Sequence, residues 1–443
     1  MDRTAVSTLG PPPPEAPSEP TAEERARIQR RVLRVLTGGQ VVGAAALASA
    51  ITVGGFVVQD LLGDETVWVG LATATITTGT AFMSQALSRL MSRRGRRPGL
   101  QLGYLMASVG GLLAGLGAEM GILWLFLVGL FLFGNGQASN LLARYAAADL
   151  ALSGERGRAM SRILFASTFG AVLGPLTITP AEQAGQAWFE WGKYTGPWVL
   201  SAVLFGGAMV NTLLRLRPDP LVVAGGVVPS GGVRPAIPPL SRALRVIAAD
   251  PRARLALLAM VVSQATMVGV MAMTPVHMKL HGHEDVSPYV VSAHIAGMFA
   301  FSPLVGRFTD RHGQLAGIRM SGIVLAAASV TAALSGDVEQ LLFPAMFLIG
   351  VGWSFGLIAG SSLLTESVPA AERVSIQGSA DLMMSLCGGA AGLSSGFIRN
   401  AFGFHMLASL STVATLLLIV AAAAFGMRHA GSPLLAATVR RQS

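Results

Sequence analysis

Long apolar stretches alternate with short charged segments along nearly the whole chain. A bilayer core of about 30 Å needs about 20 apolar residues for one helical crossing. Twelve stretches reach this length, namely 34–59, 66–88, 99–118, 121–144, 162–180, 195–214, 254–278, 288–306, 316–335, 340–364, 375–398 and 402–427. The pattern predicts an all-α integral membrane protein with twelve transmembrane helices.

The composition excludes a soluble protein. Of the 443 residues, 52% are hydrophobic and only 12% are charged, and the mean hydropathy is +0.58, whereas a soluble domain has about 25% charged residues. The 53 glycines suit helices that pack closely in a membrane. The charges collect at the ends of the apolar stretches, so we expect a lipid bilayer and no nucleic acid as a partner. The single cysteine, Cys387, excludes an intrachain disulfide.

One long, proline-rich connection divides the twelve stretches into six and six. It predicts an N-terminal segment (1–33), a first six-helix bundle (34–216), a linker (217–253), a second six-helix bundle (254–428) and a tail (429–443). The N-terminal segment is polar and has a run of prolines at residues 11–14, and we expect its start to be disordered.

Two amphipathic patterns lie outside the twelve stretches. Thr21 and Glu24 have the spacing of a capping box ahead of a basic stretch. In the linker, Leu240, Leu244 and Ile247 share one helical face, and arginines occupy another. Both patterns predict short helices, which lie either at the membrane surface or with a solvated charged face.

The basic residues predict the orientation in the membrane. With the N-terminus inside, only Lys193, Lys279 and Arg399 of the 32 lysines and arginines lie outside. Because cytoplasmic loops carry the excess of basic residues, we expect both termini in the cytoplasm. Arginine far outnumbers lysine, which is typical of GC-rich bacterial genomes and favours a bacterial inner membrane.

The two halves share an internal repeat. The segment from Ser88 to Arg97 closes the second stretch, and the segment from Gly306 to Gly313 closes the eighth, at an offset of 218 residues. The same offset superposes further glycines, which are Gly134 and Gly352, Gly170 and Gly388, and Gly174 and Gly392. This predicts two six-helix units repeated in parallel orientation.

The second of these loop segments has the pattern G-x-x-x-D-R-x-G at Gly306, Asp310, Arg311 and Gly313. It follows an even-numbered stretch and is repeated in the other half. In this it resembles the cytoplasmic loop motif of the major facilitator superfamily, and the resemblance covers nearly the whole chain after residue 33. We expect the aspartate to lie against the N-terminus of a neighbouring helix.

The first loop departs from this motif. It keeps Arg93, Gly95 and Arg96 but has Ser88 and Ser92 where glycine and aspartate are expected. A serine hydroxyl accepts a hydrogen bond but brings no charge. We therefore expect the first loop to hold its contact more weakly than the second.

The fifth stretch contains Gly170, Gly174 and Pro175. Their spacing is similar to the G-x-x-x-G-P element of drug–proton antiporters in the same superfamily. The two glycines form a smooth helix face, and the proline is expected to kink the helix. The same residues are equally consistent with plain helix packing.

Ionisable side chains inside the apolar stretches are costly and are therefore functional candidates. Asp381 is the first candidate for a proton-coupling group, and its alternative role is a structural partner of an arginine such as Arg311 or Arg93. His294 is the second candidate, because an imidazole changes charge near neutral pH, and its alternative role is in packing.

Two further charges bracket the end of the fourth stretch. These are Arg144 and Asp149. We interpret both as interfacial charges, because a long side chain near a helix end reaches water at little cost.

The resemblance also implies a central cavity lined by the first, fourth, seventh and tenth helices. Polar side chains in these stretches are candidates to bind a substrate there, namely Gln40, Asn135, Gln137, Gln264, Thr266, Trp353 and Ser354. Amides, hydroxyls and one indole suit a polar, weakly charged organic molecule. Each could instead make a hydrogen bond between helices.

These observations favour a secondary active transporter of a small organic molecule, with proton-coupled efflux of drug-like or metabolic compounds ahead of uptake of a nutrient. The alternative from another class is a receptor or scaffold with the same fold that does not transport. No clustered acid–base set or nucleotide-binding loop is present in the sequence, so we expect no enzyme activity, cofactor or metal. We expect the protein to be a monomer.

Overall fold

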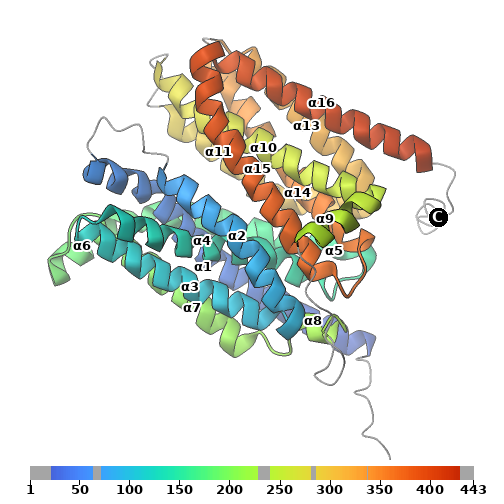
Figure 1. The fold of residues 1–443 in the computed structure, drawn as a ribbon, viewed down its shortest axis with the longest axis horizontal. Helices are drawn as coiled ribbons and strands as arrows, with labels where there is room; N and C mark the ends of the chain where they lie inside the picture. The colour runs from blue at the N-terminus through green and yellow to red at the C-terminus, as the bar shows by residue number, and fades with distance from the viewer. Residues whose placement is uncertain (1–20, 63–70, 228–239, 281–285, 337, 430–443) are drawn as a thin grey trace, which may run out of the picture.

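The computed structural model describes residues 21–62, 71–227, 240–280, 286–336 and 338–429. Within these ranges the chain is almost entirely α-helical (Figure 1). The helices are α1 (Ala22–Leu62), α2 (Leu71–Arg94), α3 (Arg96–Glu119), α4 (Leu123–Ala148), α5 (Arg156–Leu176), α6 (Ile178–Phe189), α7 (Thr195–Arg215), α8 (Pro220–Val223), α9 (Leu240–Ala249), α10 (Pro251–Leu280), α11 (Ser287–Phe299), α12 (Ser302–His312), α13 (Gln314–Ala333), α14 (Leu342–Ser367), α15 (Arg373–Phe402) and α16 (Phe404–His429).

A helix is present at each of the twelve predicted stretches. In the described part of the chain, ten candidate spans are long and apolar enough to cross a membrane. The other two stretches correspond to α2 and α15, which carry more polar side chains and pack against each other. The eighth stretch is divided into α11 and α12 at Ala300 and Phe301. The predicted all-α membrane fold is confirmed, and the helices agree with the count of twelve.

The helices form two bundles, α1 to α7 and α10 to α16, each with its own hydrophobic core. In Figure 1 the first bundle runs from blue to green and the second from yellow to red. In the first core, the rings of Phe126 and Phe133 pack edge-on against Trp198. At Gly110 and Gly129, α3 and α4 approach so closely that a Cβ on either glycine would meet the backbone of the other helix. Close approach of small residues is how membrane helices associate, since lipid is as apolar as their side chains.

One end of both bundles carries most of the arginines, and we call it the basic end. It includes the last turns of α2, α4, α7, α12, α14 and α16 and the first turns of α3, α5, α10, α13 and α15. We call the other end the opposite end. The two bundles contact each other where α2 packs on α15 and where α5 packs on α11, α12 and α14.

The two amphipathic patterns outside the spans have different outcomes. The capping box is confirmed, because the Thr21 N–H donates to Glu24 Oε2 at 3.0 Å and the Glu24 N–H donates to Thr21 Oγ1 at 3.3 Å. The prediction of a separate short helix there is wrong, since α1 runs without a break from Ala22 into the first span. The linker helix is confirmed as α9, and it buries Ala243 and Ile247 against α10 and α15.

The pattern of apolar residues does not predict α6. The fifth span ends at Leu176, and the chain then forms α6 before it enters α7. The expected end of the fifth span at residue 180 is therefore wrong. Thr177 is the N-cap of α6, and this helix is too short to cross a membrane.

Candidate functional site

A buried ion pair joins the two bundles. Arg144 of α4 donates from Nη2 to Asp381 Oδ1 of α15 at 2.5 Å and from Nη1 to Oδ2 at 3.3 Å. Both side chains are 0% exposed. The two-point geometry matches the planar guanidinium to the planar carboxylate, which is the strongest form of this contact.

The other donors of Arg144 are also satisfied. Its Nε donates to Ser361 Oγ of α14 at 3.1 Å, its Nη2 donates to the Tyr145 hydroxyl at 3.1 Å, and its Nη1 donates to the Leu141 carbonyl. Three helices from two bundles therefore hold one guanidinium. A buried pair in which one partner is removed costs about 3–5 kcal/mol, because the other charge is left uncompensated.

This pair changes two of the sequence-based interpretations. Arg144 is not an interfacial charge, because its side chain is fully buried inside the protein. Asp381 does have an arginine partner, but the partner is Arg144 and not Arg311 or Arg93. The sequence signal was present, since a charge in an apolar helix needs a partner, but nothing in the sequence says which of the many arginines provides it.

A second polar layer lies nearer the basic end. Arg96 pairs with Asp149 at 2.8 Å within the first bundle, and its Nη2 also donates to Gln377 Oε1 of α15 at 2.8 Å. Asp149 is therefore a partner of a buried arginine and not an interfacial charge. Arg156 pairs across the bundles with Glu366 at 3.2 Å.

The helices α2 and α15 touch directly beside this layer. The Ser379 hydroxyl donates to Gln85 Oε1 at 2.8 Å. A Cβ on Gly378 would collide with the Ser88 side chain, so this glycine is what allows the two bundles to meet. Ser88 Oγ is buried and has no hydrogen-bond partner among the described residues.

The second loop motif forms the other contact between the bundles. The Asp310 carboxylate accepts hydrogen bonds from the N–H groups of Gly157 and Arg158 at 2.8 and 2.9 Å, in the first turn of α5. These are donors that a helix leaves unpaired at its N-terminus, where negative charge is also favoured. The predicted position of Asp310 is confirmed. Gly306 lies directly against Gly157 and leaves no room for a Cβ, and Gly313 ends α12 with a φ of +87°, next to Arg311 in the last turn.

The first loop motif lacks this contact, as its sequence predicts. The Ser92 hydroxyl donates to the Arg89 carbonyl of its own helix at 2.9 Å. Arg93 is exposed, while Gly95 has a φ of +96° and leads into Arg96. The link from this loop to the second bundle is therefore the Arg96–Gln377 hydrogen bond.

The candidate cavity residues hydrogen-bond within their own bundles. Gln40 Nε2 donates to Ser167 Oγ at 2.9 Å in the first bundle, where Asn135 Nδ2 donates to the Leu132 carbonyl at 2.7 Å. In the second bundle, Trp353 Nε1 donates to Gln264 Oε1 at 2.7 Å.

The remaining cavity candidates differ in burial. Thr266 and Ser354 are buried, and Gln137 is half-buried. Among the cavity candidates, three buried oxygen atoms have no hydrogen-bond partner in the described part of the chain, which are Gln40 Oε1, Asn135 Oδ1 and Ser354 Oγ. Each keeps the capacity to accept a hydrogen bond.

His294 lies inside the second bundle. Its Nδ1 is 2.9 Å from the Met346 carbonyl of α14, and the side chain is buried. This contact joins α11 to α14 and does not cross between the bundles. The position suits a packing histidine better than a group that senses the movement of one bundle against the other.

The fifth-span glycines pack α5 against α1. A Cβ on Gly170 or Gly174 would meet the backbone of α1 at Ala45. Pro175 is the residue before the last one of α5, and the chain turns into α6 directly after this helix. The kink expected at Pro175 stays a prediction.

Comparisons with known proteins agree with this fold. The sequence model of the Major Facilitator Superfamily matches residues 36–392 and 285–440. The MFS-type transporter YddS of Bacillus subtilis is 35% identical over 90% of this chain and 91% of its own length. The riboflavin transporter RfnT of Brucella anthropi is 28% identical over 85% of this chain and 91% of its own length. Among solved structures, the human organic anion transporter MFSD10 (TETRAN) superposes with a TM-score of 0.73 at 14% identity, over 89% of this chain and 99% of that one.

Proposed function

The chain belongs to the Major Facilitator Superfamily, and from this premise we propose that it exports a small organic molecule in exchange for protons by alternating access. Its relatives over 90% of the chain are transporters. The observation that carries the proposal is the Arg144–Asp381 pair, because it is an ionisable contact that exists only while the two bundles touch at this level.

Alternating access requires the bundles to part at the basic end and meet at the opposite end. We place the basic end in the cytoplasm of a bacterial inner membrane, with both termini there, because arginine-rich ends stay inside. The moving units are the bundles 34–216 and 254–428, joined by the linker 217–253, and one chain supplies both. In this arrangement the structure has its cytoplasmic gate closed.

Parting the bundles separates Asp381 from Arg144. A bare carboxylate and a bare guanidinium in a low-dielectric setting are costly. Protonation of Asp381 before separation removes one of the charges. The Tyr145 hydroxyl and the Leu141 carbonyl, which belong to α4 as Arg144 does, still accept hydrogen bonds from the guanidinium after the bundles part. A proton thus lowers the cost of opening the gate.

Export follows if the proton reaches Asp381 from outside and leaves to the cytoplasm. The gate then opens inward, the proton is released, and substrate binds at the polar side chains proposed for the cavity. The carboxylate pairs with Arg144 again as the gate closes, and the substrate leaves outward. The similarity of Gly170, Gly174 and Pro175 to the antiporter element favours this direction.

Uptake is the second candidate function, and the name of one relative points to a substrate that can be tested. That relative is named a riboflavin transporter. In this chain the Trp353 indole is held by Gln264, and the Phe299 ring packs edge-on against it at 5.9 Å. An aromatic side chain beside an amide suits a planar, polar ring system. Riboflavin is therefore the first compound to test as a substrate.

The test is transport by proteoliposomes with an imposed pH gradient. We expect the wild-type protein to move substrate against its concentration gradient. Asp381→Asn should abolish this accumulation but leave exchange of labelled for unlabelled substrate, which needs only the gate and a filled site. Gln137→Ala, which changes a half-buried cavity candidate, is the control for reduced binding.

Three results would contradict the proposal. Gradient-driven transport by Asp381→Asn at the wild-type rate rejects proton coupling through Asp381. Accumulation of substrate with the proton flow, and not against it, replaces export by uptake. Tight substrate binding without any flux identifies a receptor.

A further inference from the structure

Gln377 of α15 lies where the two bundles meet, one helical turn before Asp381 on the side of the basic end. Its side chain is fully buried. Its Oε1 accepts a hydrogen bond from Arg96 Nη2 of the first bundle at 2.8 Å, and its Nε2 donates to Thr365 Oγ1 of its own bundle at 3.0 Å. The amide therefore bonds the other bundle through its oxygen while its own bundle holds its nitrogen.

The charge that Gln377 contacts is balanced inside the first bundle. Arg96 makes two contacts to Asp149, from Nε to Oδ2 at 2.8 Å and from Nη2 to Oδ1 at 3.0 Å. Because both residues belong to the first bundle, this ion pair stays together when the bundles part. Separation at this level breaks a hydrogen bond between a guanidinium and a neutral amide, and it leaves no charge without a counter-charge.

The contact at the next turn of α15 has a different cost. Arg144 and Asp381 lie in different bundles, so parting them leaves two buried charges uncompensated. In the proposed cycle a proton removes one of these charges, and opening the gate therefore takes up a proton at Asp381. Two successive turns of α15 thus hold the gate closed, one by a contact that depends on pH and one by a contact between groups that do not titrate near neutral pH.

The charged groups around Gln377 come from both bundles. In the described part of the chain they are Arg96 and Asp149, Arg144 and Asp381 one turn further along α15, Arg373 one turn nearer the basic end, and the Arg156–Glu366 pair close to Arg373. Among these groups, the amide bonds Arg96. An uncharged side chain in place of Gln377 therefore removes this bond and leaves every charge of the layer as it was.

We propose that Gln377 is a positioning residue of the gate, which sets the pH at which the gate opens without itself binding a proton. Its bond to Arg96 stabilises the closed gate equally at every pH, whereas Asp381 supplies the part that depends on protons. The inference rests on the proposed function, in which opening takes up one proton. For such an equilibrium, a tenfold change in the equilibrium constant displaces the pH dependence by about one unit. Loss of the bond makes opening easier, so less acid is needed and the dependence moves to higher pH.

The test is the rate at which a maleimide labels Ser88→Cys from about pH 5 to about pH 9, in permeabilised membranes and with Cys387 replaced by serine. Ser88 is fully buried against Gly378 between α2 and α15, so a thiol there reacts when the bundles part. Each rate is divided by the rate of the denatured protein at the same pH, which cancels the ionisation of the thiol. The measurement needs no substrate.

We expect the normalised rate of the parent to rise as the pH falls. Gln377→Met has a similar length but no oxygen to accept the bond, and it should move the curve by about one pH unit to higher pH, with its slope unchanged. Gln29→Met is the matched control. Gln29 Nε2 donates to the Ala147 carbonyl at 2.7 Å within the first bundle, so its loss should leave the curve in place.

Arg96→Lys is a second variant that keeps the test decisive if Gln377→Met lowers the folded yield. A lysine keeps the positive charge beside Asp149 but lacks the planar fork with which Arg96 binds two partners. It should move the curve as far as Gln377→Met does. The two changes together should move the curve no further than either alone, because they remove the same bond.

Two results would overturn the inference. One is a curve that neither Gln377→Met nor Arg96→Lys displaces, and the other is a changed slope, which would mean that Gln377 alters the number of protons taken up. Failure of the proposed function gives a different result. A pH dependence that survives Asp381→Asn assigns the proton to another carboxylate, such as Glu366 or Asp310, and a displacement by Gln377→Met would still support the role of Gln377.

Discussion

Removal of the Asp381 charge should open the gate, and the structure sets the size of the effect. The carboxylate is fully buried and bridges the bundles by two hydrogen bonds to Arg144. In Asp381→Asn the guanidinium keeps its three contacts to Ser361, Tyr145 and Leu141 but loses its counter-charge. The expected cost to the closed state is about 3–5 kcal/mol. Part of this is recovered when the bundles separate and water reaches Arg144, so the equilibrium shifts toward the open gate.

A thiol at Ser88 reports this shift. Ser88 is 0% exposed and lies directly against Gly378 between α2 and α15, so a maleimide reaches it only when the bundles part. With the native Cys387 replaced by serine, Ser88→Cys should react slowly in the otherwise unchanged protein. Adding Asp381→Asn should raise the labelling rate in membranes by up to about 10²–10⁴-fold, which is the population change that 3–5 kcal/mol produces.

A double substitution separates the effect of an unpaired charge on the gate from the effect of a changed side-chain shape. Arg144→Met with Asp381→Leu leaves no unpaired charge, and apolar pairs of similar volume are often as stable as the ion pair that they replace. The double variant should therefore label more slowly than either single variant. A rate for Asp381→Asn within about threefold of the parent would refute the reasoning, as would single effects that simply add in the double variant.

The remaining predictions concern the loop motif, His294 and the topology. Asp310→Asn should slow transport strongly, because it removes the charge that caps the N-terminus of α5, a contact of about 0.3–2 kcal/mol. Ser92→Ala should have a mild effect, because the Ser92 hydroxyl bonds only its own helix. Equal losses of transport in the two variants at matched membrane expression would contradict the difference between the two loops. His294→Gln should leave the dependence of transport on pH unchanged. It should lower the free energy of unfolding by about 1–3 kcal/mol, because it disturbs a buried hydrogen bond. A shifted pH profile would instead assign His294 to proton coupling. Reporter fusions after Gly192 and after His283 should be accessible from outside and a fusion after Gly313 should not, and a cytoplasmic signal after His283 would reject the proposed orientation.

The sequence by itself determined the features that depend on neighbouring residues. The length of an apolar run specifies a membrane-spanning helix, because every backbone group in the bilayer must be satisfied within the helix. The loop motif predicted that Asp310 meets the N-terminus of a packed helix, although the helix that it meets, α5 of the other bundle, is about 150 residues away in the sequence. The capping box at Thr21 and Glu24 is likewise a contact between residues three positions apart.

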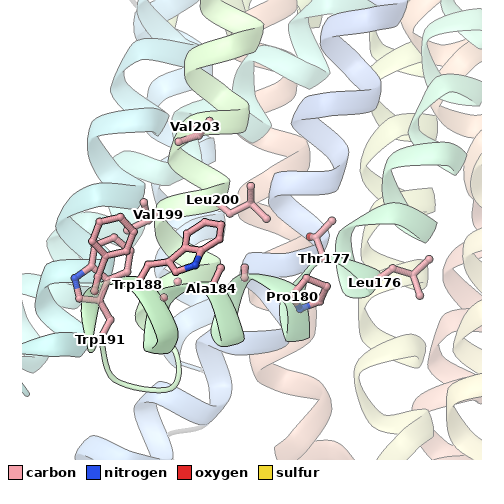
Figure 2. A pocket seen from close by; sticks show the side chains of 13 residues that line it. Leu176, Thr177, Pro180, Ala184, Trp188, Trp191, Val199, Leu200 and Val203 are labelled. Carbon is pink, nitrogen blue, oxygen red and sulfur yellow. The ribbon is translucent and has the colours of Figure 1, made fainter.

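Only the tertiary structure decided which distant residues meet. Arg144 and Asp381 are far apart in sequence and lie in different bundles, and a chain with 32 basic residues offers many partners for one buried carboxylate. The cost of a buried charge requires that a partner exist, but the packing of one bundle on the other, with α2 against both α4 and α15, selects it. The same holds for α6: its twelve residues carry no span signal, and Gly185 and Gly196 let it lie directly against α7, where the two helices line the apolar pocket of Figure 2. Short-range patterns specify helices, and the close approach of helices then specifies the sites between them.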